Sequence, residues 1–189
     1  MSIQDLISIV NKGENEGLNN RLNKVHHDLF NELSDHIERI SLKYNYHPSR
    51  KVTIEVYPDL PSFHQAVGEA DAPNWLWLIS EINPKAPKWI RQGIGGYEAK
   101  QMTQNFIEVT RKEAINNLSI PTFDQLDNDT WDFDTMKGFQ FSYLFVKFVD
   151  QQYGIDHLNQ LIRNPQDFNG IFQCSEKELH QKMVEFISK

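Results

Sequence analysis

The stretch PKWIRQGIGGYEA, residues 87–99, decides the expected fold because it combines a helix start, three glycines and two aromatic residues. A helix is predicted to open at Trp89 and to run through Gln101 or beyond, since the preceding NPKAP breaks the chain. The glycines lack the G-x-x-x-x-G-K-[ST] pattern of a phosphate-binding loop. Close packing of this helix against a neighbour is therefore the better explanation for them.

Elements before this stretch are predicted from the spacing of apolar residues. A short helix is expected over residues 3–10, and apolar residues at three- and four-residue steps predict a long amphipathic helix over 18–44. Alternating apolar residues at 52–56 indicate a half-buried strand. A short helix is expected at 62–70, and the apolar run NWLWLIS, residues 74–80, is interpreted as a second strand.

Elements after this stretch are predicted to be helical. Residues 103–118 allow either a helix or a strand. The segment MKGFQFSYLFVKFVDQQY, residues 136–153, is apolar on most sides, as a buried helix would be, and Gly154 is a natural C-cap. A short helix follows at 156–163, and the S-x-x-E spacing that begins at Ser175 predicts a capping box that opens the last helix. The expected fold class is α+β, mostly helical with a small central β-sheet.

Composition limits the class of protein. The 189 residues are 39% hydrophobic and 12% aromatic, which is enough to build a sizeable core. We expect an N-terminal arm of residues 1–17 and a single domain of residues 18–189. The formal net charge of -7 argues against nucleic acid and anionic membranes as partners.

We recognise neither a secretory signal nor a membrane-spanning segment in the sequence. The single cysteine, Cys174, rules out an intrachain disulfide and a Cys-rich zinc module. The opening MSIQDLISIVNKGENEG is not typical of a secretory signal, because polar residues interrupt its apolar ones. A run of about 18 apolar residues, as a membrane span needs, is absent. The expected location is the cytoplasm.

The segment WIRQGIGGY, residues 89–97, resembles the W-L-N-E-G-(L/F)-A-x-Y segment of the gluzincin metallopeptidases, the peptidase MA-like group. The resemblance extends to the order of the elements over roughly residues 20–188. In that group, two histidines of HExxH and the glutamate of W-L-N-E-G hold a zinc ion. The resemblance implies a gluzincin-like fold with its cleft beside this segment.

The zinc ligands of that group have no counterpart in this chain. No two of its seven histidines are four residues apart, so HExxH is absent, and Gln92 stands at the position of the glutamate ligand. The nine residues 78–86 between Trp77 and Pro87 leave no room for the missing helix. The resemblance thus implies a degenerate member with no catalytic residue, no metal and no cofactor.

The functional hypothesis is a non-catalytic, pseudo-peptidase binding module for a peptide or protein partner. An extended peptide is expected to pair with the sheet edge at 74–80. Six residues around the lost cleft are candidates for lining this groove: Trp75, Trp77, Trp89, Gln92, Tyr97 and Glu98. For the tryptophans, core packing is the simpler explanation.

Other functions stay open. One is a hydrolase with a non-zinc mechanism that uses Glu98, His64 or Glu55, and another is a purely structural subunit. Asp28, Glu32 and His36 share one helix face and could bind a divalent ion, but a solvated face is the better interpretation of this spacing.

Overall fold

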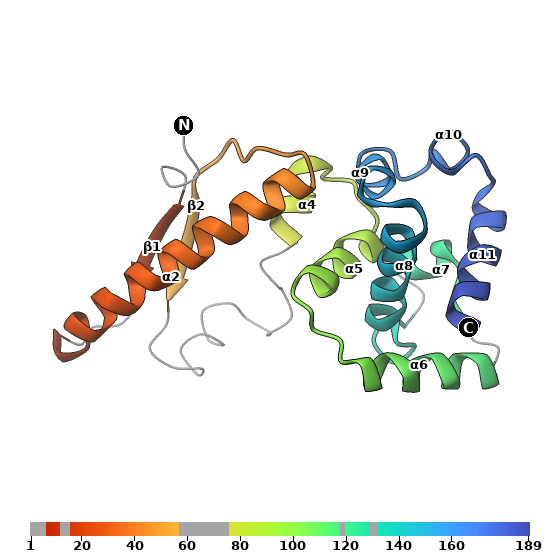
Figure 1. Ribbon diagram of the computed structural model, residues 1–189, viewed down its shortest axis with the longest axis horizontal. Coiled ribbons are helices and arrows are strands. Elements are labelled where there is room, and N and C mark those ends of the chain that lie inside the picture. Colours follow the sequence, from red (N-terminus) through yellow and green to blue (C-terminus); the bar gives the residue numbers. More distant parts are fainter. Residues whose placement is uncertain (1–6, 12–15, 57–75, 118–119, 129–131) are drawn as a thin grey trace. The chain divides into compact units, whose positions relative to one another are not determined.

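The structure is a computed structural model, and it describes residues 7–11, 16–56, 76–117, 120–128 and 132–189. By its internal contacts the chain divides into two compact units, Met1–Ala72 and Pro73–Lys189. Each unit is described by itself below (Figure 1). The division expected from the sequence, an arm of residues 1–17 and a domain of residues 18–189, stays a prediction.

The N-terminal unit combines two strands with one long helix. Strand β1 (Ile7–Asn11) pairs in parallel with β2 (Val52–Val56), and helix α2 (Glu16–Lys43) connects them, as a parallel pair requires. The long helix and the strand at 52–56 are thus confirmed. The helix predicted for residues 3–10 is wrong from Ile7 onward, because the β-branched residues of ISIVN find strand partners in VTIEV.

All the regular secondary structure described in the C-terminal unit is helical. Its helices are α4 (Leu76–Ile82), α5 (Lys88–Glu98), α6 (Gln104–Asn117), α7 (Phe123–Asp127), α8 (Gly138–Tyr153), α9 (Ile155–Arg163), α10 (Phe168–Phe172) and α11 (Glu176–Ser188). Helices make up 70% of the described residues of the whole chain. The predicted α+β class with a small central β-sheet is therefore wrong: among these residues the only strands are β1 and β2, at the N-terminal end of the sequence.

The second strand predicted at 74–80 is also wrong over its described residues, 76–80, because these belong to helix α4. Ile79 is buried, and Asn83, just after the helix, donates a hydrogen bond from Nδ2 to the carbonyl oxygen of Ile162 at 2.9 Å. This bond ties α4 to α9. A short apolar run has no periodicity that separates a buried strand from a buried helix, so its neighbours in space decide.

Helix α8 forms the centre of this unit, as the buried helix predicted at 136–153. It packs against α5, α9, α6 and α11 (Figure 1). Phe145 is 0% exposed and contacts an aromatic cluster in which its ring centroid lies 6.0 Å from Trp89 and 4.9 Å from Phe123. Phe168 extends this cluster at 5.4 Å from Phe123. An aromatic cluster that spans four helices is therefore part of the core of this unit.

The contact between α5 and α8 depends on glycine. A Cβ atom at Gly93 would lie 2.3 Å from the Ser142 carbonyl oxygen, so the backbones of the two helices approach too closely for any side chain. A Cβ atom at Gly96 would lie 2.7 Å from the end of the Phe139 ring. Close packing, expected from the glycines of the opening stretch, is confirmed at both positions.

Local signals set several helix ends correctly. Gly154, with φ of 85°, ends α8 as the predicted C-cap. Ser175 and Glu178 form the predicted capping box at the start of α11, where the Ser175 hydroxyl accepts a hydrogen bond from the Glu178 amide. Within residues 103–118, for which both alternatives stayed open, Gln104–Asn117 form helix α6.

Candidate binding groove

Of the three candidate groove tryptophans, only Trp89 has a described side chain, and it does not line a groove. Trp89 is 2% exposed, and its ring lies 5.0 Å from that of Phe123 in a tilted arrangement, so it is a core residue, the alternative weighed for it. Trp75 lies outside the described residues, and so does the side chain of Trp77. The peptide-binding sheet edge expected at 74–80 is wrong for residues 76–80, the described part of this run, because they belong to α4.

The other three candidates, Gln92, Tyr97 and Glu98, lie half-buried on α5. The Tyr97 hydroxyl donates a hydrogen bond to Asp150 Oδ2 at 2.7 Å, and its ring contacts Tyr143 edge to face at 5.6 Å. Burial, and then the hydrogen bond to Asp150, raises the pKa of Tyr97 above its ordinary value of 10.0. Tyr97 therefore joins α5 to α8.

We expect Tyr97→Phe to lower the free energy of unfolding by about 1 kcal/mol at neutral pH, because the bond to Asp150 is lost. The raised pKa means that the folded state keeps the phenol proton when the unfolded state begins to lose it near pH 10. Stability should thus fall as the pH rises above about 10, and more steeply in the wild type than in Tyr97→Phe. Urea denaturation at pH 7 and over this alkaline range measures both effects. Parallel pH profiles of the two proteins would contradict it.

A groove of about 690 Å³ lies elsewhere, between helices α6, α8 and α11. Each helix contributes side chains at helical spacing, so that one face of each points into the groove. From α8 come Leu144, Lys147, Phe148, Gln151, Gln152 and Tyr153; from α11 and its end come Lys182, Glu185, Phe186 and Lys189; from α6 come Ile107 and Arg111. On both α8 and α11 the stripe follows the pattern i, i+3, i+4, i+7.

Specific contacts hold the three helices around the groove. The rings of Phe148 and Phe186 lie 5.4 Å apart and join α8 to α11. Arg111 donates from Nε to the carbonyl oxygen of Ile187 at 2.7 Å, which joins α6 to the last turn of α11. Helix α11 is therefore joined to both α8 and α6 beside the groove.

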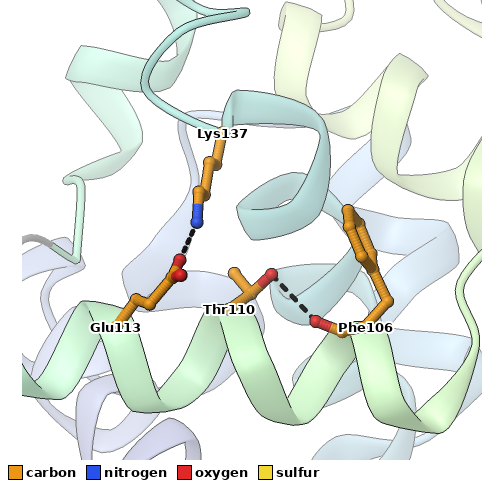
Figure 2. A network of polar contacts seen from close by, with 4 residues as sticks. All are labelled: Phe106, Thr110, Glu113 and Lys137. Atoms are coloured by element: carbon orange, nitrogen blue, oxygen red, sulfur yellow. Dashed lines mark hydrogen bonds and ion pairs between the residues drawn. The ribbon is translucent and has the colours of Figure 1, made fainter.

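Helix α6 is also fixed at the start of α8. Figure 2 shows Lys137, the residue just before α8, forming an ion pair with Glu113 on α6. On the same helix, the Thr110 hydroxyl donates to the carbonyl oxygen of Phe106 at 3.0 Å, while the Phe106 side chain is 45% exposed (Figure 2). Phe106 is therefore a surface residue of α6 that does not line the groove.

The charge of the groove is opposite to that of the chain. Four cationic side chains and one carboxylate, Glu185, line it, whereas the whole chain has a formal net charge of -7. Electrostatic interactions with Tyr153 and Cys174, together with side-chain hydrogen bonds to both, raise the pKa of Lys182 above its ordinary value of 10.5. A lysine that titrates above this value is an ammonium ion at neutral pH.

The sequence contained a signal for this groove that the predictions missed. Leu144, Lys147, Phe148 and Gln151 repeat the spacing and the mixed apolar and cationic character of Lys182, Glu185, Phe186 and Lys189. Such stripes mark half-covered helix faces. Only the packing of α8 beside α11 shows that the two stripes share one groove.

The described residues contain neither a metal-binding cluster nor a membrane-spanning helix. There, no group of three or more His, Cys, Asp or Glu side chains could hold a metal ion. Asp28, Glu32 and His36 are exposed on α2. Within the same part of the chain, none of the helices combines the length and the apolar character needed to cross a membrane.

Comparisons of the chain with protein-family models, with curated proteins and with solved structures found no match. The resemblance to the gluzincin metallopeptidases therefore stays a prediction from the sequence.

Proposed function

We propose that this protein is a non-catalytic binding module and that the groove between α6, α8 and α11 holds a peptide segment of a partner. The observation that supports this proposal is the groove itself, a concave site of about 690 Å³ that three helices line with aromatic and cationic side chains. Its volume is in the range of about 300–1,000 Å³ that ligand sites commonly have. Lining stripes on two neighbouring helices offer an elongated ligand more contacts than a compact one.

We also propose that the protein is a pseudo-peptidase, a degenerate relative of the gluzincin metallopeptidases. This proposal is supported by the WIRQGIGGY segment and by Gln92, which replaces the glutamate ligand. The cytoplasm is the proposed location, in keeping with a chain that has a single cysteine. The alternative hydrolase gains no support, because His64 lies outside the described residues, and Glu55 and Glu98 belong to different units.

A binding experiment with one groove variant and one matched control tests the proposal. A labelled peptide library is screened by fluorescence anisotropy, and the best peptide is titrated into the wild type, Phe186→Ala and Phe106→Ala. Phe186 lines the groove and is half-buried, so its truncation should weaken binding about tenfold or more. Phe106 lies on the groove helix α6 outside the lining, so Phe106→Ala should bind as the wild type does.

A second variant guards against a folding defect in Phe186→Ala. Gln151 is exposed and lines the groove, so Gln151→Trp should block the site without disturbing the core. Failure of the whole library to bind, or equal affinity in all four proteins, would contradict the proposal and would favour a purely structural role.

We expect the purified protein to hold no stoichiometric zinc, and Gln92→Glu not to restore it, because the two histidine ligands have no counterpart. Elemental analysis of protein purified without a histidine tag, before and after dialysis against zinc, measures this. About one zinc ion per chain that is lost in Gln92→Ala would show that the argument from the missing ligands is wrong.

A further inference from the structure

We infer that the occupant of the groove is an acidic peptide segment, with its carboxylates at Arg111, Lys147 and Lys182 and a bulky apolar side chain against Phe186. This inference rests on the proposed function and adds the chemistry of the ligand. Charge, the placement of the cations and the apolar surface between them each support it.

The first support is the sign of the local charge. The chain carries 26 acidic and 19 basic residues, yet four of the five charged side chains that line the groove are cationic. Cations gathered in a concave site repel one another and attract an anion, and they raise its local concentration. The groove therefore selects a ligand of negative charge.

The second support is the placement of the cations. Lys182 lines the groove from α11, and the bond from Arg111 Nε to the Ile187 carbonyl fixes the guanidinium group beside α11. A guanidinium group held in this way can present N–H donors to a carboxylate in a fixed geometry. Lys147 lines the groove from α8. Anchors on three helices suit a ligand with several carboxylates.

The third support is the apolar surface beside the cations. Phe186 lines the groove and is half-buried, and its ring lies 5.4 Å from the buried ring of Phe148. A small inorganic anion would use the cations and leave this surface in water. A peptide segment that carries carboxylates and one aromatic or aliphatic side chain covers both parts.

Two other anionic partners fit less well. A nucleic acid extends past the groove and would meet the remaining surface of a chain whose net charge is -7. An anionic membrane is a broad surface and cannot enter a concave site between three helices. A short peptide segment, by contrast, contacts only the groove.

The test compares two labelled peptides on the intact chain. One contains glutamates around a central phenylalanine, and the other has glutamine at every glutamate position. The glutamate peptide should bind at least about tenfold more tightly, and its affinity should fall as salt is added. Lys147→Glu should weaken its binding about tenfold, since the variant replaces an attraction with a repulsion. Glu185→Gln should tighten it, because the variant removes the one carboxylate of the lining.

The matched control is Lys177→Glu, which makes the same charge change at an exposed residue of α11 outside the lining and should leave the affinity unchanged. Equal binding of the two peptides, lost in Phe186→Ala, would overturn the acidic ligand but keep the proposed function. No binding of either peptide or of any library peptide would remove both. Tighter binding of inorganic phosphate, of single-stranded DNA or of phosphatidylcholine–phosphatidylserine vesicles, lost in Lys147→Glu, would also overturn the peptide assignment.

Discussion

Phe145→Ala is expected to lower the free energy of unfolding by about 3–5 kcal/mol, because a large side chain is removed from a site that cannot collapse. Phe145 is 0% exposed, and its ring contacts Trp89 at 6.0 Å and Phe123 at 4.9 Å. These neighbours come from α5 and α7, so the cavity would lie where three helices meet. Urea denaturation followed by tryptophan fluorescence measures the loss.

The control for this variant is Phe106→Ala, which removes the same side chain from a site that is 45% exposed. It should change the free energy of unfolding by no more than about 0.5 kcal/mol. If Phe145→Ala costs less than about 1 kcal/mol, α8 is peripheral and the described core is wrong.

Gly93→Ala is expected to destabilise the protein by about 1–3 kcal/mol. In a helix, alanine is ordinarily preferred over glycine by about 1 kcal/mol, so the expected sign is the reverse of the usual one. The reason is the Ser142 carbonyl oxygen, 2.3 Å from the position of the new Cβ atom. A backbone atom cannot rotate away, so α5 and α8 would have to separate.

Gly96→Ala is the matched control on the same helix. Its new Cβ atom would meet the end of the half-buried Phe139 ring at 2.7 Å, and a side chain can rotate out of the way. We therefore expect a smaller loss than for Gly93→Ala in the same urea titration. Gly93→Ala as stable as the wild type would show that the two helices are further apart than described.

The parts of the fold that sequence reasoning predicted correctly depend on local signals. The apolar spacing of α2 and α8, the glycine after α8 and the Ser175 capping box act within a few residues of the chain. The errors arose where distant partners decide. The run at 76–82 is a helix that binds α9 through Asn83, and β1 is a strand because β2, far along the chain, pairs with it.

The candidate site also depends on residues that are distant in sequence. Three of its four cations, Arg111, Lys147 and Lys182, are more than thirty residues apart in sequence, and no motif links them. The aromatic signal of the opening stretch pointed to Trp89, which the packing of α5, α7 and α8 places in the core. A groove formed by three helix faces becomes visible only when their packing is known.

The central claim, that the groove between α6, α8 and α11 is the ligand site, is tested most directly by nuclear magnetic resonance. The glutamate–phenylalanine peptide, or the best library peptide, is titrated into uniformly ¹⁵N-labelled protein, and the shifts of the backbone amides are mapped. We predict the largest shifts at Ile107 and Arg111, at 144–153 and at 182–189. Shifts centred on Gln92–Glu98 or within residues 16–56, with the groove amides unchanged, would contradict the account.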